Sequence, residues 1–85
     1  MKKSNTIQMN VYTLIVVDTR ADPADPDLYV SVYQNKEDAI RAGIEYANFY
    51  DFDFTDEEKY NVLNAGNDLK RGAIHILPIC ERPVQ

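Results

Sequence analysis

The sequence has few of the residues on which small secreted, metal-binding or catalytic domains depend. Its single cysteine, Cys80, allows no disulfide within the chain and no zinc site built from several thiolates. A lone thiol is typical of proteins from reducing compartments, so we expect a cytoplasmic, intracellular protein. The only histidine, His75, lies between Ile74 and Ile76 and has no recognisable partner for general acid–base chemistry.

Glycine and long apolar runs are equally scarce. None of the three glycines (Gly43, Gly66 and Gly72) opens a helix after a strand, so a phosphate-binding loop is not expected. No apolar run approaches the roughly 20 residues that would span a bilayer. We therefore expect a protein that is not an enzyme, that needs no cofactor or metal, and that does not contact a membrane.

Basic residues are outnumbered by acidic ones, with nine lysines and arginines against 14 aspartates and glutamates and a net charge of −5. The imbalance is concentrated in residues 18–68, which carry 13 acidic and four basic residues. Such a surface repels the phosphate backbone and makes direct nucleic-acid binding improbable. It favours a protein partner with a basic surface, or no partner.

Three segments rich in β-branched and aromatic residues are predicted to be strands: residues 11–17, 28–33 and 73–80. The first is apolar on both faces, which is typical of a central strand. Residues 22–27, Asp-Pro-Ala-Asp-Pro-Asp, predict the loop of a hairpin between the first two strands. Pro78 places the third strand at an edge, because proline cannot donate to a ladder.

Two helices are predicted between the second and third strands. Asn35 is a suitable N-cap for a helix from Lys36 to about Asn48 or Tyr50. Residues 55–58, Thr-Asp-Glu-Glu, form a capping box, and the helix that follows is expected to reach about Ala65.

The order β-β-α-α-β predicts an α+β fold in one domain, residues 1–85. We expect both helices to pack on one face of a three-stranded antiparallel sheet whose first strand is central. Residues 1–9 and 81–85 are expected to be flexible ends.

The most unusual segment is residues 50–58, Tyr-Asp-Phe-Asp-Phe-Thr-Asp-Glu-Glu, with five acidic residues, three aromatic residues and no basic residue. If residues 50–54 are extended, the rings point one way and the two aspartates the other, roughly 6–7 Å apart. The rings would then cover the core while the carboxylates stay in water. Alternatively, the carboxylates imitate nucleic-acid phosphates and occupy a basic groove on a partner. The candidate contact residues are Asp51, Asp53, Asp56, Glu57 and Glu58.

A second acidic cluster lies in the hairpin loop and comprises Asp22, Asp25 and Asp27, with Asp18 just before it. A calcium loop would require a glycine turn and a terminal glutamate, and neither is present at the necessary position. We interpret this cluster as a solvated loop that could extend the partner-binding surface.

Two tyrosines are the remaining candidate contact residues. Tyr29 and Tyr33 alternate with Leu28, Val30 and Val32, so the two sets lie on opposite faces of a strand. If the aliphatic set packs beneath the helices, the tyrosines lie on the open face of the sheet. Exposed tyrosines are typical of contact surfaces.

Two functions from different classes remain open. The first is a non-catalytic protein-interaction module with an acidic surface. In its sharpest form it is an inhibitor that imitates nucleic acid and blocks a basic nucleic-acid-binding protein, as phage and mobile-element inhibitors of restriction or CRISPR systems do. The alternative is a self-associating structural or accessory protein, a homodimer formed through the tyrosine-bearing sheet face.

Overall fold

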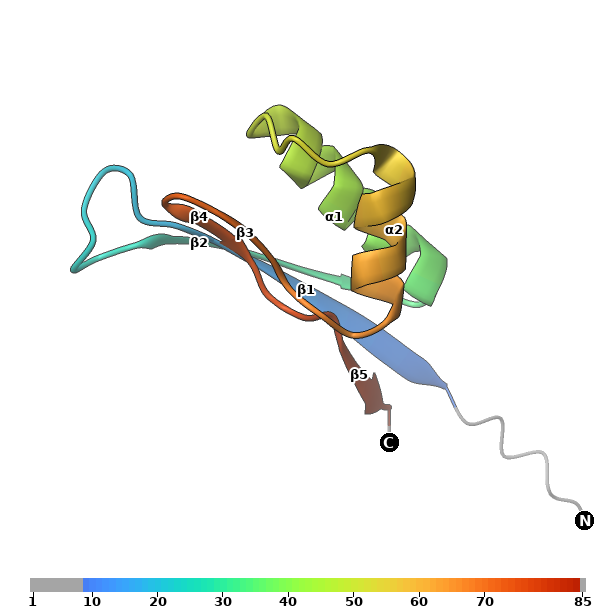
Figure 1. Cartoon of the computed structure of the whole chain (residues 1–85). Coiled ribbons are helices and arrows are strands. Elements are labelled where there is room, and N and C mark those ends of the chain that lie inside the picture. The colour runs from blue at the N-terminus through green and yellow to red at the C-terminus, as the bar shows by residue number, and fades with distance from the viewer. Residues whose placement is uncertain (1–8, 85) are drawn as a thin grey trace, which may run out of the picture.

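Two helices cover one face of a five-stranded antiparallel sheet in the computed structural model, which describes residues 9–84 (Figure 1). The strands are β1 (Asn10–Asp18), β2 (Asp27–Tyr33), β3 (Leu69–Arg71), β4 (Ile74–Ile76) and β5 (Cys80–Pro83). The helices are α1 (Lys36–Phe49) and α2 (Asp56–Asn64). The predicted α+β class and the placement of both helices on one face are confirmed.

Strand β1 is central, as its apolar sequence predicts. It pairs with β2 along one side, and along the other it pairs with β4 near its end and with β5 near its start. Strand β3 adds to β4 as a short hairpin. The prediction of three strands is therefore wrong, because the sheet contains five.

The additional strands arise where the sequence indicated one continuous strand and a frayed end. Residues 73–80 are divided between β4 and β5, and Pro78 lies in the break, where its missing N–H costs no ladder bond. Across this break the Leu77 N–H still donates to the Ile15 carbonyl at 2.9 Å. Residues 81–83 belong to β5 and are paired rather than free. Of the two expected flexible ends, residues 1–8 and 85 lie outside the described residues.

The core lies between the sheet and the helices. Leu14 and Val16 of β1, Ile40 of α1, Leu63 of α2 and Ile76 of β4 are all fully buried. They come from four elements that are distant in sequence, so they join both helices to the centre of the sheet. Stability should therefore depend mainly on these contacts rather than on helix propensity.

The faces of β2 are the reverse of those predicted. Tyr29 pairs directly with the buried Val16, so it points toward the helices, and Tyr33 follows on the same face. The rings of Tyr29 and Tyr46 lie with their centroids 6.1 Å apart. Because β2 is at the edge of the sheet, long amphipathic rings can bridge from it to α1 while their hydroxyls reach water.

The aliphatic residues of β2 therefore lie on the face that no helix covers. Leu28, Val30 and Val32 are 60%, 60% and 59% exposed. The expectation that these three residues pack beneath the helices is wrong.

Candidate functional site

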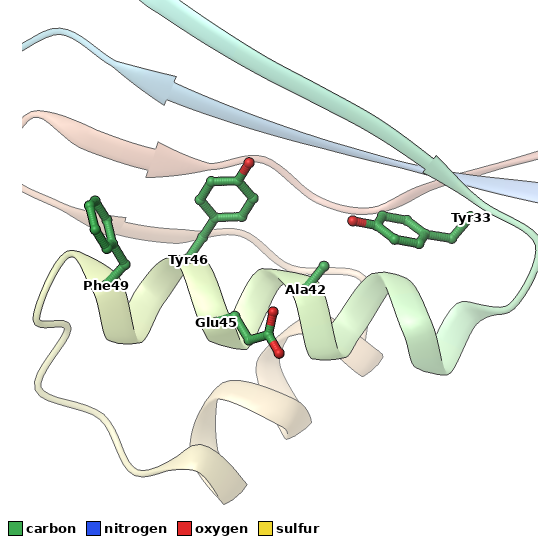
Figure 2. Close-up of a pocket in the computed structure, with 5 residues that line it drawn as sticks. All are labelled: Tyr33, Ala42, Glu45, Tyr46 and Phe49. Carbon is green, nitrogen blue, oxygen red and sulfur yellow. The ribbon is translucent and has the colours of Figure 1, made fainter.

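A groove runs between α1 and the end of β2, and three aromatic rings contribute to its walls (Figure 2). Helix α1 provides Ala42, Glu45, Tyr46 and Phe49, and β2 provides Tyr33. The four helical positions follow the spacing i, i+3, i+4 and i+7, which places them along one side of the helix. The groove has a volume of about 420 Å³, within the range of roughly 300–1,000 Å³ typical of ligand sites.

The groove combines apolar walls with a free carboxylate. Tyr33 and Tyr46 pack against the core, whereas Phe49 is 75% exposed. Glu45 is exposed and makes no ion pair or side-chain hydrogen bond within residues 9–84. A cation seated here would meet both a carboxylate and aromatic faces, each of which favours it.

The hollow continues along α1 toward its first turn. A second depression shares Tyr33, Ala42 and Glu45 with the groove and adds Asp38 and Arg41. Asp38 and Arg41 form an exposed ion pair at 3.1 Å, so Glu45 remains the unpaired charge of the two hollows.

Strand β2 presents an unpaired edge in the described part of the chain. It pairs with β1 along one side only, and no described strand pairs with the other side. An edge of this kind offers backbone donors and acceptors to an extended peptide, while an adjacent groove can accept one of its side chains. Sequence reasoning selected Tyr33 but missed Glu45, Tyr46 and Phe49, although their helical spacing was a visible signal.

The acidic-aromatic segment is a turn rather than an extended strand. Asp51 has a φ of 60°, and the N–H groups of Asp51 and Phe52 donate to the carbonyls of Asn48 and Ala47. These bonds form a Schellman motif that ends α1. Phe52 is buried, whereas Phe54 is 47% exposed. The expected alternation of rings and carboxylates, and the phosphate-like spacing derived from it, are therefore wrong.

Several carboxylates of this segment have partners within the fold. Asp53 lies 3.8 Å from Arg71, and Asp56 lies 3.6 Å from the buried Lys59. Lys59 also donates to the side-chain oxygen of Asn48. The bond from Lys59 to Asn48 joins α2 to α1, and the Asp53–Arg71 pair joins the loop between the helices to β3.

Glu58 completes the predicted capping box of α2. It accepts from the Thr55 N–H at 2.8 Å, and the Thr55 hydroxyl accepts from the Glu58 N–H at 3.1 Å. The backbone hydrogen bond from Thr55 lowers the pKa of Glu58. The side chains of Asp51 and Glu57 make no hydrogen bond or ion pair among the described residues. They are therefore the two acidic residues of the segment whose carboxylates remain available to a partner.

The three acidic residues of the hairpin loop, Asp22, Asp25 and Asp27, have different environments in the structure. The Asp22 side chain accepts from the Ala24 N–H at 3.0 Å, and its carbonyl accepts from the Asp25 N–H at 3.0 Å. Asp27 begins β2 opposite Asp18. Asp25 is exposed. No cluster of three or more His, Cys, Asp or Glu residues that could hold a metal occurs in residues 9–84.

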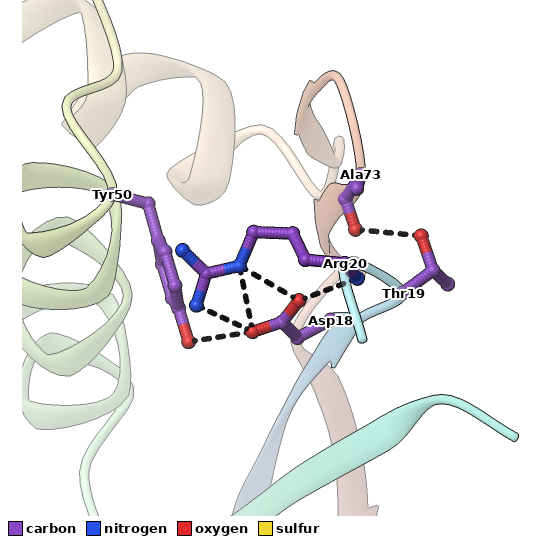
Figure 3. A network of polar contacts seen from close by, with 5 residues as sticks. All are labelled: Asp18, Thr19, Arg20, Tyr50 and Ala73. Carbon is purple, nitrogen blue, oxygen red and sulfur yellow. Dashed lines mark hydrogen bonds and ion pairs between the residues drawn. The ribbon is translucent and has the colours of Figure 1, made fainter. Parts of the chain in front are cut away.

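A polar network that sequence reasoning missed lies at the end of β1 (Figure 3). Asp18, only 4% exposed, accepts from Arg20 Nη2 at 2.8 Å, from Nε at 3.0 Å, and from the Arg20 N–H at 2.9 Å. The hydrogen bond from the Arg20 side chain lowers the pKa of Asp18. The Tyr50 hydroxyl donates to the same carboxylate at 3.4 Å, and the Arg20 guanidinium lies 4.8 Å from the centre of the Tyr50 ring.

This network joins the sheet to the end of α1. Burial raises the pKa of Tyr50, which therefore stays a hydrogen-bond donor. The sequence did contain a signal for this network, because Asp18 and Arg20 are two residues apart at the end of an apolar strand.

His75 and Cys80 lie on the face of the sheet opposite the helices, because they pair with Val17 and Thr13 of β1. The His75 Nε2 is 2.5 Å from the Asp68 carboxylate, and Cys80 is an exposed free thiol.

No helix within residues 9–84 is long and apolar enough to cross a membrane. Searches of protein-family models, curated proteins and solved structures find nothing that matches this chain.

Proposed function

We propose that this chain is a non-catalytic protein-interaction module that binds an extended, basic segment of a partner protein. The observation that carries the proposal is the groove of Tyr33, Tyr46 and Phe49 beside the outer edge of β2, where within residues 9–84 Glu45 has no partner and no strand pairs with that edge. The net charge of −5 favours the approach of a basic partner.

The proposed mode of binding is strand addition. Backbone groups of the partner pair with the outer edge of β2, and an arginine or lysine side chain enters the groove toward Glu45. Main-chain pairing supplies affinity without regard to sequence, so the charge and the rings of the groove supply the specificity.

The inhibitor hypothesis is the narrower form of this proposal. In it, the partner is a basic nucleic-acid-binding protein whose binding surface the acidic side of this chain covers. The exposed carboxylates of Asp51 and Glu57 support it, as does the position of most acidic residues on the helices and loops. Glu58 and Asp56 support it less, because they already stabilise α2.

The test is an NMR titration with a capped peptide, acetyl-Val-Arg-Val-Arg-Val-amide, and with the same peptide carrying glutamate in place of arginine. We expect amide shifts along β2 and at residues 42–49 with the arginine peptide only. Glu45→Lys should weaken binding at least about tenfold, since a charge-assisted contact is worth roughly 1.5–3 kcal/mol.

Glu57→Lys is the matched control, because it makes the same charge change on an exposed residue of α2 that does not line the groove. Equal weakening by both variants would show that only net charge matters. Shifts that avoid β2 would contradict the proposed mode of binding.

A further inference from the structure

No described helix or strand covers the face of the sheet opposite the helices (Figure 1). We call it the open face. Strand register and alternation place eleven strand residues on it: Val11, Thr13, Ile15, Val17, Leu28, Val30, Val32, Lys70, His75, Cys80 and Arg82. It is distinct from the groove, which lies on the helix side of β2.

The open face holds five of the eight large apolar side chains that are exposed in the described part of the chain. Of these, Leu28, Val30 and Val32 lie along the β2 edge of this face. Met9 and Val84, 50% and 49% exposed, fall on the same face when the alternation continues one residue past the β1–β5 ladder. Contiguous apolar patches of this kind in soluble proteins mark contact surfaces.

The charge of the open face differs from that of the whole chain. None of its eleven strand positions is acidic, and Lys70 and Arg82 are basic. The Asp68 carboxylate lies 2.5 Å from Nε2 of His75, one of these eleven residues. Two copies of this chain could therefore approach through their open faces while the acidic helices and loops point away from each other.

We infer that the open face binds the open face of a second copy, giving a homodimer in which two sheets stack. Three strand positions across and ten residues along, from Met9 to Asp18, give a flat footprint of roughly 450 Å² per copy. A flat footprint omits the surface of the side chains that project from the sheet. With that surface included, the two footprints reach the ~1,000 Å² that a specific interface needs. Stacked sheets of this kind lie about 10 Å apart and enclose an aliphatic core.

This inference does not depend on the proposed function, because the groove and the β2 edge remain accessible in such a dimer. Its two grooves lie on outward surfaces and could bind two segments of one partner.

Sedimentation equilibrium of the full chain between about 1 and 500 μM tests the inference. We expect the wild type to dimerise and Val30→Lys to raise the dimer dissociation constant at least about tenfold. Phe54→Lys also places a lysine at an exposed apolar position, in the loop between the helices, and as the control it should dimerise normally. Val30→Thr keeps the branched shape, so it tests the same position if Val30→Lys perturbs folding. It should weaken the dimer less than Val30→Lys does.

Cys80 gives a second measurement, because it pairs with Thr13 near the centre of the open face. Its reaction with a thiol reagent should slow as protein concentration rises through the dimerisation range. A chain that stays monomeric to about 500 μM, or a dimer that Val30→Lys leaves intact, would overturn the inference. A monomer that binds anionic phospholipid vesicles through Val30 would assign the face to lipid instead. Failure of the arginine peptide to bind would leave the dimer result unaffected.

Discussion

At the scale of single residues, Asp51 and Gly66 occupy the same position after the two helices, although only Asp51 has a side chain. Each follows a helix with positive φ, 60° and 85°, and each begins a Schellman motif. Glycine adopts this conformation freely, whereas a residue with a Cβ is strained by about 1–2 kcal/mol, somewhat less for aspartate. Asp51 is the one non-glycine residue with positive φ in the described part of the chain.

Asp51→Gly should therefore stabilise the protein by about 1 kcal/mol, because it removes this strain without removing a side-chain contact. Urea unfolding at fixed protein concentration measures the change. Asp53→Gly, two residues on and with no positive φ, should be neutral or destabilising. A loss of stability in Asp51→Gly would mean that the Asp51 carboxylate supports the turn.

At the scale of elements, α2 depends on its first turn. It has only nine residues, two of them buried, so its N-terminal hydrogen bonds are a large part of what defines it. Thr55→Ala removes the hydroxyl that accepts from Glu58 and should lower the free energy of unfolding by about 1 kcal/mol. Thr55→Ser retains the hydroxyl and should keep most of the stability. Equal losses in both variants would indicate that packing, and not capping, is responsible.

Both helices and the central strand could be predicted because their signals are local. The capping box lies within four residues, and the apolar run of β1 needs no knowledge of its neighbours. Strands β3 and β5 could not be predicted, since Leu69–Arg71 and Cys80–Pro83 are too short and too charged for an alternating pattern. They are strands because β4 and β1 lie beside them.

The orientation of β2 shows a different limit. Alternation established that Tyr29 and Val30 point to opposite faces, and this is confirmed. It could not establish which face the helices cover, because that depends on where α1 crosses the sheet. The groove could not be predicted for the same reason, since Tyr33 lines the same groove as Tyr46 and Phe49 only after the chain has folded.

At the scale of the whole molecule, the two sides of the sheet have different chemistry. One side carries the core, the helices, the aromatic groove and most acidic residues, and the other carries exposed Leu28, Val30 and Val32. This division permits two interfaces that do not compete. The stability of such a molecule should also depend on pH, because carboxylates on its polar side have structural partners.

Three carboxyl groups titrate below their ordinary range in the folded protein. The pKa of Asp18 is lowered by the Arg20 hydrogen bond, that of Glu58 by the Thr55 backbone, and that of Asp68 by His75. A group whose pKa is lower in the folded state contributes stability above its unfolded pKa and loses it as pH falls through the folded one. Stability should therefore be nearly constant from pH 7 to about pH 5 and fall steadily below about pH 4.

Asp18 should contribute strongly to this acid dependence, because it is buried and bound by Arg20 and Tyr50. Asp18→Asn preserves its shape but removes the charge, so we expect lower stability at pH 7 and a shallower fall between about pH 5 and 3. Urea unfolding at a series of pH values, at one protein concentration, measures both effects. Asp25→Asn, in the exposed loop without a side-chain partner among the described residues, should follow the wild type throughout. If Asp18→Asn kept the wild-type stability at pH 7, the network in Figure 3 would not stabilise the junction between β1 and the end of α1.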